Sequence, residues 1–311
     1  MAEQEFVSVN EVGLRDGLQN QSVQVPIEGK LRLARALADA GLRSMEATSF
    51  VSPRAVPQMA DAAELFPALP RPDEIDYSAL IPNRKGYERA LEAGVRSVAV
   101  VLAATDTMNR KNINMSLAET RRVCADVVAR AKRDGVHSRA YVAVAFECPY
   151  EGRVSAQRTT ELTEEMFGAG ADEVIIADTI GAANPSASFD RFSGLAERFD
   201  PERLCAHFHD TRALALANAW AALHAGIRRF DSSIGGLGGC PFAPGAAGNV
   251  ATEDLVLMLG MCGFRTGIDV PGLRRAVEVA SELVGRELGG RMTAWLRSQD
   301  RRDGSGKGDA G

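Results

Sequence analysis

The stretch "LCAHFHDTRALALANAWAALHAGIRRFDSSI", Leu204 to Ile234, contains one strand–helix–strand unit. A short β-rich run, LCAHFHD, is followed by the segment ALANAWAALHAG, whose Ala and Leu residues have helical spacing, and then by a second β-rich run, RRFDSSI. Gly226 stands where the helix must end, as a left-handed C-terminal cap before a short loop requires.

The same alternation continues through most of the chain. Six further β-rich runs, each separated from the next by an amphipathic or Ala-rich segment, bring the total to eight: FVSVNEV (6–12), SMEATSF (44–50), IDYSALI (75–81), SVAVVLA (97–103), SRAYVAVAF (138–146) and EVIIADT (173–179). Eight strand and helix units predict an α/β fold of the (β/α)8 TIM-barrel type. A doubly wound open sheet is the alternative, but no GxGxxG motif follows the first run.

The barrel is expected to form a single domain over residues 1–299, with a Gly-rich lid loop after the eighth strand and extra C-terminal helices. The tail from residue 300 to 311 has no apolar side chain larger than alanine, and we expect it to be disordered.

Composition and charge narrow the choice of partners and compartment. The 311 residues are 45% hydrophobic and carry a net charge of −5, which argues against nucleic-acid or anionic-membrane partners. The N-terminal MAEQEFVSVN lacks the features of a targeting signal, and no apolar run is long enough to span a membrane. The five cysteines show no CxxC spacing, so we expect a reducing cytoplasm, with four of them buried as small hydrophobes: Cys124, Cys148, Cys205 and Cys262.

Polar residues cluster where the predicted strands end. Active sites of TIM barrels lie at the carboxyl ends of the strands. The candidates at this rim come from five different strands or the loops that follow them: Arg15, Asp16, Glu46, Asp178, Thr179, His207, His209 and Asn249.

The pair His207 and His209 is the most informative of these. Alternate residues of a strand face the same side, so both imidazoles point the same way. Together with the carboxylate of Asp16 and the amide oxygen of Asn249 they make a mixed N/O set suited to a divalent cation such as Mg²⁺ or Mn²⁺. The alternative is that both histidines are structural and bonded to backbone groups.

The segment "GGLGGCPFAPGAAGN", Gly235 to Asn249, cannot pack as a regular element because of its glycines and prolines. It is either a flexible surface loop or an active-site lid whose glycines absorb the change of backbone angles on closure. Cys240 in its middle favours the lid, since a lone thiol above the rim suits an acid/base or gating role better than packing.

Several motifs in one order resemble those of the 3-hydroxy-3-methylglutaryl-CoA lyase family: EVGLRDGLQNQ, EATSFVSPRAVPQMAD, CPYEGRVS, ADTIG, HFHDT and GLGGCPFAPGAAGNVATEDLV. The Arg-Asp-Gly element is shared with isopropylmalate and homocitrate synthases and with transcarboxylases. In the synthases the loop resembles G-x-G-E-R-A-G-N, so the Cys-containing loop favours the lyase branch.

The resemblance implies cleavage of 3-hydroxy-3-methylglutaryl-CoA into acetyl-CoA and acetoacetate, in leucine degradation and ketone-body formation. It implies a divalent metal, Mg²⁺ or Mn²⁺, on Asp16, His207, His209 and Asn249. It also implies that Arg15 stabilises the enolate.

Further roles follow from the same resemblance. Cys240 would protonate the enolate and His207 is a candidate for moving a proton. Glu46 and Asp178 would be supporting or proton-handling carboxylates, and Gln19 and Thr179 would contact the substrate. From their position after the fourth strand, Lys111 and Asn112 are candidates for the CoA phosphates. We also expect an acyl-CoA substrate and a homodimer.

Two departures from the family pattern lie beside the site. After the second histidine the family commonly reads H-D-T-Y-G-Q, whereas this chain has Arg212, Ala213 and Leu214; before Asp178 it often has Ser-Leu-Gly, whereas this chain has Ile-Ile-Ala. These changes leave open another 3-hydroxy-3-alkylglutaryl-CoA or a citramalyl-like thioester as the substrate. A condensing synthase and a catalytically silent metal-binding barrel are the remaining alternatives.

Overall fold

The computed structural model describes residues 4–239 and 248–305, with the side chains of residues 299–305 left out. Eight parallel strands close into a barrel in the order β1-β10-β9-β8-β5-β4-β3-β2, which confirms the predicted TIM barrel and excludes the open sheet. The strands are β1 (Ser8–Glu11), β2 (Ser44–Ser49), β3 (Asp76–Leu80), β4 (Ser97–Ala103), β5 (His137–Ala143), β8 (Glu173–Asp178), β9 (Leu204–Phe208) and β10 (Arg229–Ser232).

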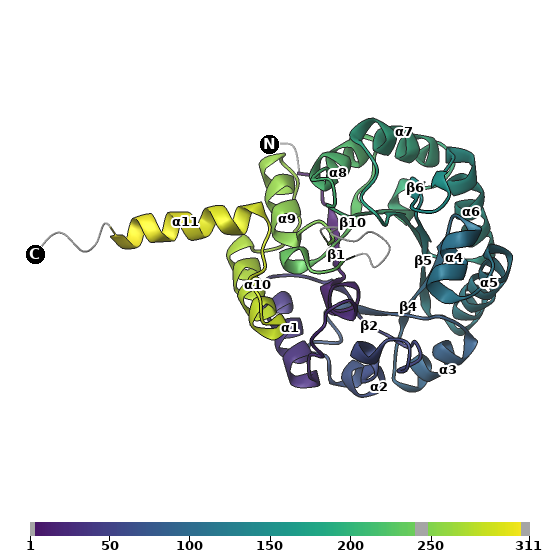
Figure 1. Ribbon diagram of the computed structural model, residues 1–311, viewed down its shortest axis with the longest axis horizontal. Coiled ribbons are helices and arrows are strands. Elements are labelled where there is room, and N and C mark those ends of the chain that lie inside the picture. Colours follow the sequence, from purple (N-terminus) through teal and green to yellow (C-terminus); the bar gives the residue numbers. More distant parts are fainter. Residues whose placement is uncertain (1–3, 240–247, 306–311) are drawn as a thin grey trace, which may run out of the picture.

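Helices surround the barrel as an outer ring (Figure 1). They are α1 (Ile27–Asp39), α2 (Ala62–Leu65), α3 (Arg84–Glu92), α4 (Asp106–Ile113), α5 (Leu117–Asp134), α6 (Ala156–Ala169), α7 (Pro185–Ala196), α8 (Ala215–His224), α9 (Thr252–Met261) and α10 (Val270–Val284). Apolar side chains on the outer face of the strands pack against this ring; Val100 of β4 and Val127 of α5 are both 1% exposed. Gly226 ends the α8 turn with a φ of 95°, as the sequence predicted.

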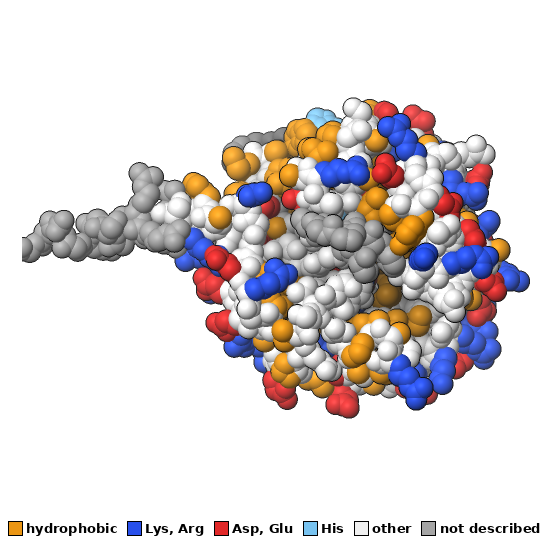
Figure 2. All heavy atoms as spheres, viewed as in Figure 1, with side chains coloured by type: hydrophobic (Ala, Val, Ile, Leu, Met, Phe, Trp, Pro, Cys, Tyr) orange, Lys and Arg blue, Asp and Glu red, His pale blue; other side chains and the backbone are white. Residues whose placement is uncertain are grey.

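A short hairpin and a C-terminal helix are added to this frame. The hairpin pairs β6 (Glu147–Cys148) with β7 (Gly152–Arg153), and α11 (Arg291–Ser305) projects away from the barrel (Figure 1). Acidic and basic side chains are interspersed around the edge of the face drawn in Figure 2. Within the described parts of the chain, no helix combines the length and apolarity needed to cross a membrane.

The helix α11 runs to Ser305, past the expected domain end at residue 299, and residues 306–311 lie outside the described residues. One expectation about the cysteines is wrong. Cys262 is exposed rather than buried, because it caps α9 just after Met261, which is 80% exposed. Cys124, Cys148 and Cys205 are buried as predicted.

Candidate active site

A single π-helical turn, η1 (Gly13–Gly17), follows β1 and carries Arg15 and Asp16. The amides of Asp16 and Gly17 both donate to the carbonyl oxygen of Val12, at 2.7 and 3.2 Å. A Cβ atom on Gly13 would lie 2.5 Å from Glu11 Oε1, and one on Gly17 would lie 2.9 Å from Leu237 Cβ. The turn therefore needs glycine at both ends to pack against the segment after β10.

Arg15 and Asp16 are bonded to each other within this turn. Arg15 Nη1 lies 2.7 Å from Asp16 Oδ1, and Arg15 Nε donates to Glu46 Oε1. Burial alone would lower the pKa of Arg15, but the carboxylates of Glu46 and Asp16 raise it above its ordinary value. Burial would likewise raise the pKa of Asp16, but Arg15 together with the two histidines lowers it. Both groups are therefore ionised at neutral pH.

His207 and His209 face the same side of the end of β9, as the strand alternation predicted. One ligand atom from each, with a carboxylate oxygen of Asp16, forms a group whose atoms all lie within 4.8 Å of one another. Burial lowers the pKa of His209 to about 4, and the neighbouring His207 adds to the effect. A neutral imidazole keeps the lone pair that a metal ion requires.

Asn249 reaches the cluster because the chain returns from the loop beside β9. Its backbone forms an antiparallel bridge with His209, and the amide of Val250 donates to Phe208 at 3.0 Å. The side-chain amide nitrogen of Asn249 donates to Asp16 Oδ2 at 2.7 Å and to the carbonyl oxygen of Leu237 at 3.1 Å. These bonds fix which way the amide oxygen points.

Two atoms of the cluster are buried without a hydrogen-bond partner among the described residues, namely Asn249 Oδ1 and His209 Nδ1. A buried acceptor without a donor is costly, and a cation between the two groups would satisfy it. Two imidazoles, one carboxylate and one amide oxygen are ligands that a divalent cation such as Mg²⁺ or Mn²⁺ accepts. The predicted residues thus fit a metal ion.

The remaining predicted carboxylates have different positions. Glu46 is fully buried inside the barrel, where it bonds to Arg15. Asp178 is 1% exposed and accepts the backbone amides of Ala182 and Ala183 at 2.8 and 2.9 Å, so it anchors the loop after β8. Burial raises the pKa of Asp178 to about 6.

Thr179 and Gln19 also bond within the protein. Thr179 Oγ1 accepts the amide of Val144 at 2.8 Å, and Val144 has a φ of 48°, an outlier for a β-branched residue. Gln19 Nε2 donates to Asp16 Oδ1 at 3.4 Å. Gln19 therefore lies beside Asp16 at the edge of the cluster, whereas Thr179 holds a strained turn after β5.

The other predicted contacts lie on or beyond the rim. Lys111 and Asn112 are exposed on α4, and the Lys111 ammonium lies 5.8 Å from the centre of the Tyr150 ring. Arg212 Nη1 donates to the carbonyl oxygen of Ala182 at 3.1 Å. Cys240 and the middle of the proposed lid lie outside the described residues.

Three buried residues of the site were missed from the sequence: Asp231, Tyr141 and Glu11. Asp231 Oδ2 lies 3.1 Å from His207 Nδ1 and 2.7 Å from the Tyr141 hydroxyl. Asp231 pairs in register with His207 and with Asn10 on the neighbouring strands. The only signal in the sequence was a carboxylate within the eighth β-rich run, RRFDSSI.

Glu11 connects the π-helical turn η1 to the segment that follows β10. Its Oε1 accepts the amides of Gly13 and Ile234 at 2.7 and 2.9 Å, and its Oε2 accepts the Thr252 hydroxyl at 2.6 Å. Burial raises the pKa of Glu11 to about 7.

The closed barrel and its rim cluster define the class of protein: a (β/α)8-barrel enzyme with a group of side chains that fit a cation beside a buried, ionised arginine. The chain belongs to the HMGL-like family, whose model matches residues 7–280, and relatives more than 40% identical over most of its length are named hydroxymethylglutaryl-CoA lyases.

Similar proteins span nearly the whole chain. A hydroxymethylglutaryl-CoA lyase of Bacillus subtilis is 41% identical over 292 residues, 94% of this chain and 98% of the relative. One of Pseudomonas mevalonii is 42% identical over 278 residues, 89% of this chain and 92% of the relative. A solved HMG-CoA lyase from Acinetobacter baumannii, in complex with coenzyme A and 3-methylmalate, has a TM-score of 0.90 at 38% identity and covers 94% of this chain and 96% of its own.

Proposed function

We propose that this chain is a divalent-metal-dependent lyase that cleaves 3-hydroxy-3-methylglutaryl-CoA into acetyl-CoA and acetoacetate by a retro-Claisen reaction. The observation that carries the proposal is the group of Asp16, His207, His209 and Asn249 directly beside Arg15, with two unpartnered ligand atoms. The names of the similar proteins supply the substrate.

The four residues of the cluster would hold Mg²⁺ or Mn²⁺. When bound, the metal supplies a Lewis acid that makes the 3-hydroxyl of the substrate easier to deprotonate. Asp16 and the neutral His209 bring one negative charge and one lone pair to the cluster. The amide of Asn249, fixed by Asp16 and Leu237, brings an oxygen.

Arg15 would stabilise the negative charge that develops during bond cleavage. The 3-hydroxyl loses its proton, C3 becomes a ketone, and the electron pair of the C2–C3 bond moves to C2 and the thioester oxygen as an enolate. A guanidinium that is always charged, and held by Glu46 and Asp16, is already oriented when this charge appears.

Proton transfer completes the reaction. We assign protonation of C2 to the Cys240 thiol and removal of the hydroxyl proton to a water molecule, because His207, the other candidate, has Nδ1 bonded to Asp231 and would use Nε2 to hold the metal. The carboxylate of Asp178 is occupied by backbone amides, so it receives a loop-anchoring role in this proposal instead of a proton-handling one.

The acyl-CoA substrate itself rests on the similar proteins, one of which has coenzyme A bound in its structure. Lys111 and Asn112, exposed on α4 at the carboxyl side of β4, keep their proposed role at the CoA phosphates. Gln19 is proposed to contact substrate beside Asp16. The hydroxyl oxygen of Thr179 accepts the backbone amide of Val144, so Thr179 is given a structural role instead. The homodimer and the cytoplasmic location stay predictions.

His209→Ala tests the metal cluster. Losing one of four protein ligands should lower the Mn²⁺ affinity by at least about tenfold. The control is His224→Ala on α8, where the imidazole packs against Trp220 and is absent from the cluster. Equal Mn²⁺ affinity in the two variants would contradict the assignment.

A further inference from the structure

We propose that Tyr141 and Asp231 are positioning residues that join the metal ligand His207 to Arg15 through the inside of the barrel. The inference rests on the proposed function, which gives His207 a role in holding the metal and Arg15 a role in stabilising the enolate. Hydrogen bonds and ion pairs link six side chains in succession, from one residue of the cluster to another: Asp16, Arg15, Glu46, Tyr141, Asp231 and His207.

The Tyr141 hydroxyl lies in the middle of this hydrogen-bond network. It lies 2.7 Å from Asp231 Oδ2 and 3.0 Å from Glu46 Oε2, and the whole residue is only 4% exposed. Glu46 belongs to β2, Asp231 to β10 and Tyr141 to β5, which lies across the closed barrel from the other two strands. The phenol therefore spans the barrel interior and joins its two sides.

The ring of Tyr141 is held as firmly as its hydroxyl. It meets the His207 imidazole edge-on, with ring centres 5.9 Å apart and an angle of 86° between the planes. The guanidinium carbons of Arg15 and Arg139 lie 5.9 and 5.8 Å from the ring centre. A phenol fixed in this way presents its hydroxyl in one orientation.

Asp231 determines how His207 is presented. Because Asp231 bonds to Nδ1 of His207, the Nε2 atom is left for a metal ion, an arrangement common among metal-binding histidines. Asp231 Oδ1 accepts Asn10 Nδ2 at 2.8 Å and Arg139 Nη2 at 3.0 Å, so the carboxylate is fixed on its other side as well.

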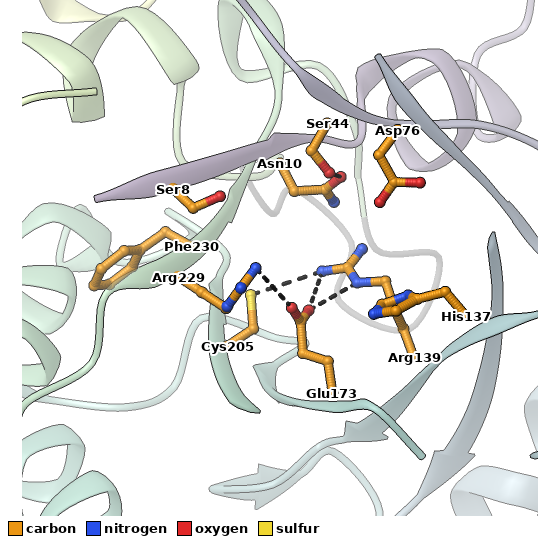
Figure 3. Close-up of a pocket in the computed structure, with 10 residues that line it drawn as sticks. All are labelled: Ser8, Asn10, Ser44, Asp76, His137, Arg139, Glu173, Cys205, Arg229 and Phe230. Carbon is orange, nitrogen blue, oxygen red and sulfur yellow. Dashed lines mark hydrogen bonds and ion pairs between the residues drawn. The ribbon is translucent and has the colours of Figure 1, made fainter. Parts of the chain in front are cut away.

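Arg139, which holds Asp231, is itself held by residues at the amino-terminal end of the barrel. Arg139 Nε donates to Glu173 Oε1 at 2.7 Å, and Figure 3 shows Glu173 between Arg139 and Arg229. These residues line a cavity of about 220 Å³ formed by the first residues of several strands. Asp231 is thus anchored from the end of the barrel opposite the catalytic rim.

Removing the Tyr141 hydroxyl leaves two buried carboxylates without the donor that they share. Glu46 is 0% and Asp231 2% exposed, so water cannot readily replace it. Mutual repulsion would then turn Glu46 and Asp231 apart, moving Arg15 on one side and His207 on the other. Loss of this one hydroxyl should therefore impair both metal binding at His207 and enolate stabilisation by Arg15.

The test compares Tyr141→Phe with Tyr87→Phe in the full-length protein. Tyr87 is a matched control, since it is 2% exposed and its hydroxyl donates to the Asp134 carboxylate at 2.8 Å, away from the cluster. Mn²⁺ binding, followed by the electron paramagnetic resonance of the free ion, should weaken by about 10- to 100-fold in Tyr141→Phe and stay unchanged in Tyr87→Phe. In turnover, Tyr141→Phe should lower kcat with little change in KM.

The outcomes separate this inference from the proposed function. Wild-type protein that does not bind Mn²⁺ would contradict the metal cluster itself. Wild-type binding with an unchanged affinity in Tyr141→Phe would contradict only the positioning role. If Tyr141→Phe does not fold, Asp231→Asn replaces it: a similar loss of Mn²⁺ affinity is expected, and wild-type affinity there would overturn the inference.

Discussion

Replacing Glu11 by Gln should change how the stability of the protein depends on pH. Burial raises the pKa of Glu11 from 4.5 to about 7 in the folded protein. The folded state therefore favours the protonated carboxyl. Its contribution to stability is fully present below the unfolded pKa of 4.5 and is lost as the pH rises to about 7.

The size of this effect follows from the two pKa values. The difference between 4.5 and about 7 corresponds to about 3 kcal/mol of unfolding free energy at pH 8. A glutamine at position 11 is neutral at every pH, and its oxygen can still accept the amides of Gly13 and Ile234. The variant should gain stability relative to wild type as the pH rises from 4.5 to 8, by up to that amount.

Urea unfolding followed by circular dichroism at a series of pH values measures this difference. Glu92→Gln is the control, because Glu92 is exposed on α3 and its replacement should give a curve parallel to that of wild type. Parallel curves for Glu11→Gln and wild type between pH 4.5 and 8 would refute the reasoning, since Glu11 would then be as easily ionised in the folded as in the unfolded state.

Three further changes test individual residues. Arg15→Lys keeps the charge but lacks the planar guanidinium whose Nε and Nη1 hold Glu46 and Asp16, so turnover should fall by at least about 100-fold while Mn²⁺ binding persists; an effect on KM alone would make Arg15 a binding residue. Cys240→Ser should lower turnover steeply with little change in KM, and near-wild-type activity would leave proton delivery to another group. Ala213→Gly should raise the unfolding free energy by about 0.5–1 kcal/mol in thermal or urea unfolding, because Ala213 has a φ of 57°; an unchanged or lower stability would contradict this.

The barrel and the grouping of Asp16, His207, His209 and Asn249 could be predicted because both depend on short-range patterns. Strand and helix alternation defines the eight units, and the two-residue period of a strand places His207 and His209 on one side. Asp16 and Asn249 follow strands whose carboxyl ends meet at one rim. The structure confirms that these four residues come together.

The Tyr141 links of the network inside the barrel could not be predicted, because they join strands that are far apart in sequence and not adjacent in the sheet. Tyr141 on β5 bonds to Glu46 on β2 and Asp231 on β10, and strand period reveals only that each points inward. Which inward-facing side chains bond to Tyr141 depends on the three-dimensional packing inside the closed barrel.

Loop conformation explains the remaining differences. Asp178 ends its strand as predicted, but the next residues turn back so that Ala182 and Ala183 donate to its carboxylate. Gly181 has a φ of 61°, and a Cβ atom there would lie 2.8 Å from the carbonyl oxygen of His209, so this turn is tight. Spacing along the sequence does not contain that information.

The most direct test of the central claim, a metal-dependent carbon–carbon cleavage at the Asp16 and Arg15 site, is product analysis with 3-hydroxy-3-methylglutaryl-CoA. Purified protein is treated with a chelator, supplied again with Mg²⁺ or Mn²⁺, and assayed for both products by mass spectrometry, with other 3-hydroxy-3-alkylglutaryl and citramalyl thioesters in parallel. We predict equal amounts of acetyl-CoA and acetoacetate, lost on chelation and restored by the metal. An intact substrate in the presence of metal, or cleavage that the chelator does not affect, would contradict the account.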